Sequence, residues 1–445
     1  MVQNDFTILE EFIAAVKFTK PSVLNQTSAC DGTLVACTSG GFINSLNFSE
    51  QSLTGSLPSS LENLTNLVSF SVSMNSLTST IPYELSRLGS MLRYFDVSSN
   101  LLNGTLPSSL GNWSQLQRFD VSNNTLTGTL PENYSSWGAF VTQLNFERNA
   151  FVGELPSSFG TAFSSLLTLD VSNNKLTGSL PESYGHLKSL QLLKCSNNTL
   201  SGTLPASYAN MSSMQSFEVE NTLTGTLPPE LSVWGDTLEK FDVCMNELNS
   251  TLPDVYSKWT KIEIFEVHSN SFIGMLPSNY SVWTKLTEFL VRNNALHGTL
   301  PAEYREWTLL TVFTGTSNSF SGTLPSLYSR WTNVKQIVLG GNSLHGTVPL
   351  SWGASMMKLQ TLALSNNMLS GTVELSSTNL LFLSISFNNF TGTLPTTSWP
   401  VLLLLDAQNN TQLSGTLSPW WLLQIASICS TKVCSSKKNI TLACF

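Results

Sequence analysis

The amino-acid sequence predicts an α/β solenoid: a right-handed coil, mostly strand and loop, with a concave parallel β-sheet and short helical turns on the convex side. Two observations predict it. The ten residues SNNTLTGTLP from Ser122 return almost unchanged as SNNTLSGTLP from Ser196. A Gly-x-Leu-Pro ending also recurs in steps of 21 to 25 residues along most of the 445-residue chain. Sequence repeats of this nearly constant length are typical of solenoids, in which each repeat packs only against its neighbours.

The endings divide the chain into about sixteen repeats over residues 43–425. They fall at Pro58, Pro82, Pro107, Pro131, Pro156, Pro181, Pro205, Pro228, Pro253, Pro277, Pro301, Pro325 and Pro349, and in degraded form at Glu374, Pro395 and Ser418. We expect residues 1–42 to form an N-terminal capping helix and cysteine cap, and residues 426–445 a C-terminal cysteine cap.

The N-terminal stretch has the spacing of an amphipathic helix. Phe6, Leu9, Ile13 and Val16 recur at helical intervals, and Pro21 ends the pattern. Two glutamates stand where a secretory signal would be apolar, so we expect this segment to open a mature chain with a start methionine added.

Each position of the repeat has a physical reason, as in FDVSNNTLTGTLP from Phe119. The alternation of Phe119 and Val121 predicts a short half-buried strand, and stacked copies give one apolar column. Asn124 stands where the chain turns, and its amide can satisfy backbone groups of neighbouring coils. Gly128 permits the second corner, and Pro131 fixes the chain after it. The turn asparagine recurs at Asn75, Asn100, Asn124, Asn149, Asn174, Asn198, Asn246 and Asn270 and onward.

A pair of aromatic residues follows many endings. The pairs are Tyr256 with Trp259, Tyr280 with Trp283, Tyr304 with Trp307, and Tyr328 with Trp331. Three-residue spacing places both rings on one face of a helical turn, so we expect them to pack in the core.

The framework L-x-x-L-x-L-x-x-N-x-L resembles the leucine-rich repeat, and the appended x-G-x-L-P is similar to its plant-type subclass. The N-terminal helix, the segment CDGTLVAC and the G-T-L-P endings also resemble the promastigote surface antigens of kinetoplastid parasites. Repeats of that family often read L-P-x-x-W-x-x-M-x-x-L, whereas here the order is usually Tyr then Trp, as in a divergent relative. This resemblance implies a cell-surface protein that contacts host proteins, including proteins of the complement type.

Two repeats depart from the frame. The one ending at Pro228 lacks a residue, leaving Asn221 as its turn asparagine, and the one ending at Ser418 has an extra residue. We expect both to bend or loosen the coil locally.

Composition excludes several classes of function. Charged residues make up 11% of the chain, the formal net charge is −8, and no basic cluster occurs, so a nucleic-acid surface is not expected. The chain has no run of 18 apolar residues, so membrane attachment would need a segment outside this chain. We expect a monomer that binds a protein partner.

Cysteines and glycosylation sequons indicate an extracellular or cell-surface protein of the secretory pathway. Cys30 and Cys37 flank the start of the repeats and are expected to pair, whereas Cys429, Cys434 and Cys444 leave the C-terminal pairing open. Fourteen Asn-x-Ser/Thr sequons lie at Asn25, Asn47, Asn63, Asn103, Asn112, Asn123, Asn133, Asn197, Asn210, Asn249, Asn279, Asn389, Asn409 and Asn439.

No catalytic, cofactor-binding or metal-binding set is expected. His297 and His345 lie two repeats apart, roughly 10 Å, which is too far to share a metal ion. Cys195 takes an inward apolar position, whereas Cys244, one position later in its repeat, is expected on the exposed side as a free thiol. We therefore expect a protein that is not an enzyme.

The residue between the inward Phe and Val points out from the concave sheet, and in sixteen successive repeats this position is acidic in seven and basic in one. We expect an acidic middle and a neutral end, with no folding requirement for the carboxylates. The candidate partner-binding residues are Asp96, Asp120, Asp170, Glu218, Glu220, Asp242, Glu266, Leu290, Thr314 and Val338.

The expected function is that of a recognition or adhesion ectodomain that binds a protein partner through this concave face. The alternative is a structural glycoprotein of a cell coat without a dedicated ligand.

Overall fold

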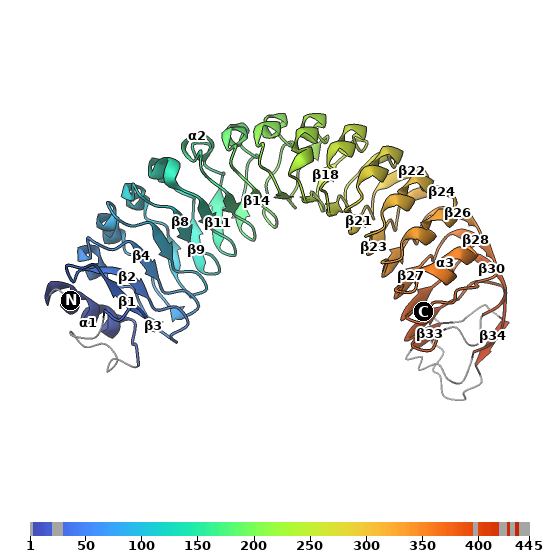
Figure 1. The fold of residues 1–445 in the computed structure, drawn as a ribbon, viewed down its shortest axis with the longest axis horizontal. Coiled ribbons are helices and arrows are strands. Elements are labelled where there is room, and N and C mark those ends of the chain that lie inside the picture. Colours follow the sequence, from blue (N-terminus) through green and yellow to red (C-terminus); the bar gives the residue numbers. More distant parts are fainter. Residues whose placement is uncertain (1–2, 20–29, 395–398, 418–424, 428–431, 436–445) are drawn as a thin grey trace. The chain divides into compact units, whose positions relative to one another are not determined.

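The computed structural model describes residues 3–19, 30–394, 399–417, 425–427 and 432–435. The chain divides into two compact units, Met1–Leu223 and Thr224–Phe445. The division falls inside the repeat that lacks one residue. In each unit, short strands line the inner side of a curve and short helices line its outer side (Figure 1). This is the predicted leucine-rich-repeat solenoid.

The inner strands of the first unit run parallel and in register, one from each coil. They are β2 (Ile43–Asn47), β4 (Ser69–Ser71), β6 (Tyr94–Asp96), β8 (Arg118–Asp120), β10 (Gln143–Asn145), β12 (Thr168–Asp170), β14 (Leu192–Lys194) and β15 (Ser216–Glu218). The outer helices are η2 (Ser59–Asn63), η3 (Tyr83–Leu88), η4 (Ser108–Asn112), η5 (Glu132–Phe140), α2 (Phe159–Ala162), η6 (Glu182–His186) and η7 (Ala206–Asn210). Short strands between them are β3 (Thr54–Gly55), β5 (Ser76–Leu77), β7 (Asn103–Thr105), β9 (Thr125–Gly128), β11 (Ala150–Gly153) and β13 (Lys175–Leu176).

The second unit repeats this plan. Its inner strands, also parallel, are β17 (Lys240–Asp242), β19 (Ile264–Glu266), β21 (Glu288–Leu290), β23 (Val312–Thr314), β25 (Gln336–Val338), β27 (Thr361–Ala363), β29 (Phe382–Ser384), β31 (Leu404–Asp406) and β33 (Ile425–Ser427). Its outer helices are η8 (Pro229–Asp236), η9 (Asp254–Lys258), η10 (Ser278–Val282), η11 (Ala302–Glu306), η12 (Ser326–Arg330) and α3 (Leu350–Ser355). Its intervening strands are β16 (Thr224–Gly225), β18 (Glu247–Leu248), β20 (Ile273–Met275), β22 (Ala295–Thr299), β24 (Ser319–Thr323), β26 (Ser343–Gly346), β28 (Met368–Gly371), β30 (Asn389–Thr393), β32 (Gln412–Leu417) and β34 (Lys432–Ser435).

The turn asparagines bond to the backbone of two coils, as predicted. Asn124 accepts the N–H of Leu102 at 2.9 Å, and its amide nitrogen donates to the carbonyls of Val97 and Val121. In the short repeat, Asn221 forms the same bonds: it accepts the backbone N–H of Leu200 and donates to the carbonyl of Cys195. These bonds replace water at turns that the next coil covers.

The paired aromatic residues of the outer turns form a buried column, as predicted. Tyr304 and Trp307 are fully buried, with ring centroids 3.7 Å apart. Trp307 donates its indole N–H to the carbonyl of Tyr280, and Tyr304 donates its hydroxyl to the carbonyl of Pro277. Each ring pair therefore fills its own coil and ties it to the preceding one.

Glycine is favoured at the second corner of the repeat for a reason besides its backbone conformation. Gly128 has φ +79°, and a Cβ there would lie 2.7 Å from the Cγ2 of Thr105 in the preceding coil. The glycine therefore makes room for the threonine methyl of its neighbour, which explains why Gly and Thr recur together in the repeat.

The N-terminal cap consists of α1 (Gln3–Ala15) and β1 (Val35–Cys37), which pairs antiparallel with β2. Leu9, Phe12 and Val16 are fully buried, whereas Phe6 and Ile13, expected on the same face, are only half-buried. The helix is rotated because the buried Asp5 accepts the N–H of Ile43 at 2.8 Å.

A disulfide joins Cys30 to Cys37 beside this cap. Cys429 and Cys444, which belong to the open C-terminal pairing, lie outside the described residues.

Candidate recognition surface

The residues expected to point out from the inner sheet form a continuous row in each unit. In the first unit Asp96 pairs with Asp120, and Asn145 pairs with Asp170, one strand apart. Glu218 lies beside Lys194 at the end of this row, and Glu220 follows two residues later. The second unit carries the remaining candidates, Asp242, Glu266, Leu290, Thr314 and Val338, on consecutive strands.

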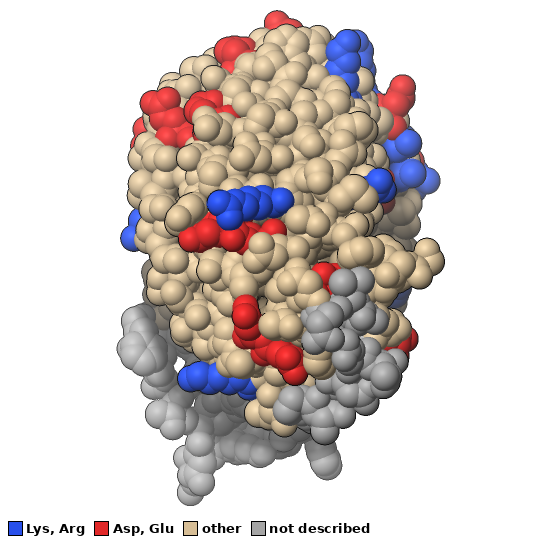
Figure 2. Space-filling model, turned by 90° about the vertical axis from the view of Figure 1, so that its left-hand side faces the viewer, with Lys and Arg blue, Asp and Glu red and all other residues tan. Residues whose placement is uncertain are grey.

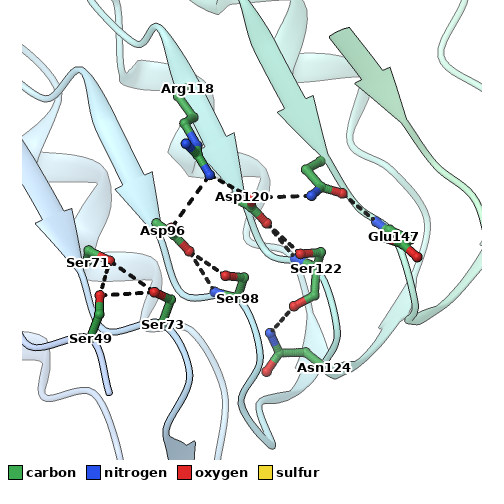
Figure 3. A network of polar contacts seen from close by, with 11 residues as sticks. Ser49, Ser71, Ser73, Asp96, Ser98, Arg118, Asp120, Ser122, Asn124 and Glu147 are labelled. Atoms are coloured by element: carbon green, nitrogen blue, oxygen red, sulfur yellow. Dashed lines mark hydrogen bonds and ion pairs between the residues drawn. The ribbon is translucent and has the colours of Figure 1, made fainter. Parts of the chain in front are cut away.

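The aspartates of this row have a structural role that was not expected from the sequence. Asp120 Oδ1 accepts the backbone N–H and the hydroxyl of Ser122, at 3.1 and 2.7 Å (Figure 3). Asp96 holds Ser98 in the same way, and Asp170 holds Ser172. These aspartates were expected to have no part in the fold, but each one accepts hydrogen bonds from the turn that follows its strand.

Burial also changes how Asp96 and Asp170 titrate. Removal from water raises the pKa of Asp96 above its ordinary value, although its hydrogen bonds with Ser98 act in the opposite direction. The pKa of Asp170 is raised for the same reason, with Lys194 lowering it in part. Desolvation outweighs the hydrogen bonds and the nearby cations at both positions.

Cations offset much of the acidic row. Arg118 Nη2 lies 3.2 Å from Asp120 and 3.8 Å from Asp96, so one guanidinium bridges two strands (Figure 3). Lys194 Nζ lies 3.4 Å from Glu218 in the first unit. In the second unit Lys240 Nζ lies 3.4 Å from Asp242. The inner face therefore presents paired charges of both signs, so the acidic middle that the sequence indicated is more strongly compensated than expected.

A hollow of about 230 Å³ opens on this face in the first unit. The row residues Asp120, Asn145, Asp170 and Lys194 line it, together with Arg118, Gln143 and neighbouring residues of the same four strands. Two cations and two carboxylates around one hollow can hold the charged or amide groups of an extended peptide.

The neutral end lies in the second unit, as expected. Leu290 and Val338 are half-buried and Thr314 is 8% exposed, so this strip offers little surface for apolar contact. The hydroxyl oxygen of Thr314 is buried and has no hydrogen-bond partner among the described residues.

The sequon asparagines of the described residues lie on the surface. Asn25 and Asn439 fall outside the described residues, Asn409 is half-buried, and the other eleven are exposed. Several stand on outer helices, such as Asn63 on η2, Asn112 on η4 and Asn279 on η10. Asn47 lies on inner strand β2.

Three histidines are exposed, including His297 and His345, but His268 is buried. Cys195 is fully buried, as predicted, and burial raises its pKa well above the ordinary thiol value. Cys244 was expected on the exposed side, and this was wrong: it is only 5% exposed.

Cys244, Glu266 and His268 converge on the inner side of the second unit. This set was not predicted from the sequence, where only the distance between two histidines, His297 and His345, was considered. The detectable signal was that Cys244 and His268 occupy the same position in consecutive repeats.

Basic residues do not form a stripe on the face drawn in Figure 2, where charged side chains are scattered among uncharged ones. Within the described part of the chain, no helix has the length and apolar character needed to cross a membrane.

Comparisons with known proteins agree with this geometry. The leucine-rich-repeat family model matches residues 91–113, 115–137 and 165–187. No curated protein matches the sequence. The plant peptide hormone receptor RGFR1, solved in complex with RGF2, is 26% identical with a TM-score of 0.82; the match covers 88% of this chain and 63% of the receptor, less than two thirds of its length.

Two further solved structures share the fold. The Arabidopsis receptor kinase HAESA, in complex with the peptide hormone IDA and the co-receptor SERK1, is 23% identical with a TM-score of 0.67, covering 97% of this chain and 90% of the other. A Leptospira interrogans leucine-rich-repeat protein is 22% identical with a TM-score of 0.56, covering 87% and 90%. The repeat, the stacked strands and these matches together identify the chain as a leucine-rich-repeat protein with a fold like that of plant receptor ectodomains.

Proposed function

We propose that this protein is an extracellular or cell-surface recognition ectodomain, without catalytic activity, that binds a protein or peptide through its inner strand face. One observation carries the proposal: the hollow lined by Arg118, Asp120, Asp170 and Lys194. Its charges are fixed by pairing and by turn hydrogen bonds, so it is organised before a partner arrives. Binding to an organised surface costs less conformational entropy than binding to a mobile one.

Location outside the cell is supported by three features. Exposed sequons recur on the outer helices, a disulfide closes the N-terminal cap, and several solved structures of similar fold are receptor ectodomains. Disulfides persist mainly in oxidising compartments, and N-glycans are added in the secretory pathway. We propose a monomeric glycoprotein in which several of these asparagines carry glycans.

The likeness to kinetoplastid surface antigens narrows the partner. The segment CDGTLVAC and the G-T-L-P endings support a parasite surface antigen that contacts a host protein, including one of the complement type. Charge pairs around a hollow act mainly on the association rate and on partner choice.

A structural coat glycoprotein is the second candidate, and the eleven exposed sequons favour it. A coat needs a rigid, glycan-covered rod but no accessible inner face. The inner strands carry only Asn47 among the described sequons, and this keeps the inner face open.

The test fills the hollow. Gln143 is exposed on β10 at the edge of the hollow, and Gln336 is exposed at the same repeat position on β25 of the second unit. The chain is produced in a secretory host and screened by surface plasmon resonance against extracellular proteins and peptides. A partner should bind the wild type and Gln336→Trp but lose at least about tenfold in affinity for Gln143→Trp, which fills the hollow.

Equal affinity of every partner for both variants would contradict recognition through the hollow. Binding to neither variant nor wild type, combined with a large mass loss on enzymatic deglycosylation, would favour the coat.

A further inference from the structure

Three metal-ligating side chains meet on the inner side of the second unit. The thiol of Cys244, a carboxylate oxygen of Glu266 and a ring nitrogen of His268 lie within 4.8 Å of one another. Cys244 follows β17 and His268 follows β19, at a position that is serine in other coils, for example Ser122. Glu266 ends β19, two residues before His268.

The hydrogen bonds of His268 set its tautomer. Its Nε2 lies 3.4 Å from Arg292 Nη2, and its Nδ1 lies 3.2 Å from Ser269 Oγ. A guanidinium can only donate, so Nε2 presents its lone pair and Nδ1 carries the hydrogen, which it donates to Ser269. A metal-binding histidine has this arrangement, in which one nitrogen presents its lone pair and the other is oriented by an outer partner.

Distances between the donor atoms suit a tetrahedral ion. Zinc binds sulfur at about 2.3 Å and nitrogen or oxygen at about 2.0–2.2 Å, which places ligand atoms roughly 3.3–3.7 Å apart. His268 Nε2 and Glu266 Oε2 are 3.8 Å apart. The thiol lies within 4.8 Å of a ring nitrogen of His268 and of a carboxylate oxygen of Glu266, so a shift of about 1 Å brings it to tetrahedral spacing.

We propose that Cys244, Glu266 and His268 form a binding site for a zinc-like divalent ion, with a fourth position open to water or to a partner's side chain. Thiolate, imidazole and carboxylate are all ordinary zinc ligands, and three protein ligands leave the open position. The proposal is independent of the peptide-binding function, because all three residues lie outside the hollow.

Two neighbouring charges shape the site. The cation of Arg292 competes with the metal for the lone pair of His268, so the ion must displace it. Asp242 stays outside the donor set, because it accepts the N–H of Cys244 at 3.2 Å and lies beside Lys240.

The test titrates the metal-free full chain, with its Cys30–Cys37 disulfide intact, with Co²⁺. Binding should saturate at one equivalent, with a thiolate-to-cobalt charge-transfer band that zinc then removes. Cys244→Ser should abolish the band, and His268→Ser should weaken Co²⁺ binding at least about tenfold. Both replacements restore the serine that other coils carry, so the coil should fold, and circular dichroism checks this.

Controls separate the site from adventitious binding. Cys195→Ser and His297→Ser should leave the titration unchanged, whereas Arg292→Gln should tighten it. The proposal is overturned if no saturable binding occurs, or if folded Cys244→Ser and His268→Ser variants bind Co²⁺ as the wild type does. If either of these variants is misfolded, Glu266→Gln and Arg292→Gln are titrated in its place. The proposal is then contradicted if both variants bind Co²⁺ with the affinity of the wild type.

Discussion

Replacing Asp170 tests whether the acids of the inner face serve the fold. Asp170 Oδ1 accepts the N–H of Ser172 at 2.9 Å and its hydroxyl at 2.5 Å. In the adjacent coil Asn145 takes the same position, and its amide oxygen accepts the N–H of Glu147 at 3.1 Å. Asparagine therefore keeps the acceptor and removes the charge, whereas alanine removes both.

The expected changes in the free energy of unfolding follow from those hydrogen bonds. Asp170→Ala loses two bonds to a charged acceptor and leaves a turn N–H without its partner, which should lower the free energy of unfolding by about 2 kcal/mol at neutral pH. Asp170→Asn should stay within about 0.5 kcal/mol of the wild type, because it loses charge assistance but escapes the cost of burying a carboxylate.

The pH dependence has a definite sign. The folded state raises the pKa of Asp170, so between its unfolded and folded values the folded state binds more protons than the unfolded state. The contribution of Asp170 to stability is thus fullest below the unfolded pKa and declines as pH rises through the folded pKa. The stability of Asp170→Asn relative to the wild type should therefore improve from acid to neutral pH.

Urea unfolding at several pH values, followed by circular dichroism, measures these differences. Glu303→Ala, which removes an exposed carboxylate on η11, is the control for loss of charge alone and should change stability by less than about 0.5 kcal/mol. The reasoning fails if Asp170→Ala is as stable as the wild type, or if asparagine is as harmful as alanine.

The remaining predictions concern the coil and its cap. Trp307→Ala should lower the free energy of unfolding by about 3–5 kcal/mol, because the indole is fully buried. Trp307→Phe should lower it by less, and urea unfolding measures both changes. Equal losses in the two variants would refute the role of ring packing. Gly55→Ala should lower the melting temperature more than Gly138→Ala, since a Cβ at Gly55 lies 2.2 Å from a helix α1 carbonyl oxygen and one at Gly138 meets nothing within 4 Å; the reverse order would contradict this packing. Replacing Cys30 and Cys37 together by serine should cost about 2 kcal/mol under non-reducing conditions, and no loss would show that the cap needs no crosslink.

The repeat made most of the fold predictable. Phe119, Val121 and Asn124 recur in a constant frame, and each copy must pack against a near-identical neighbour. Strand, turn and outer helix could therefore be assigned from one coil and extended to the others. The helix of the cap was less well predicted, because the buried Asp5 that anchors α1 to Ile43 falls outside the apolar periodicity.

The sequence predicted that the candidate residues lie on the inner face, but it did not predict the hollow, which only Asp120 and Asp170 of those candidates line. The sequence by itself determined which residues share the inner face, because side chains alternate along a strand and the register repeats. Only the tertiary structure decided that Asp120 holds the turn at Ser122, that Arg118 bridges two aspartates, and that Cys244 is buried beside His268. These outcomes depend on rotamers and on contacts between coils, which a one-dimensional pattern of residue types does not contain.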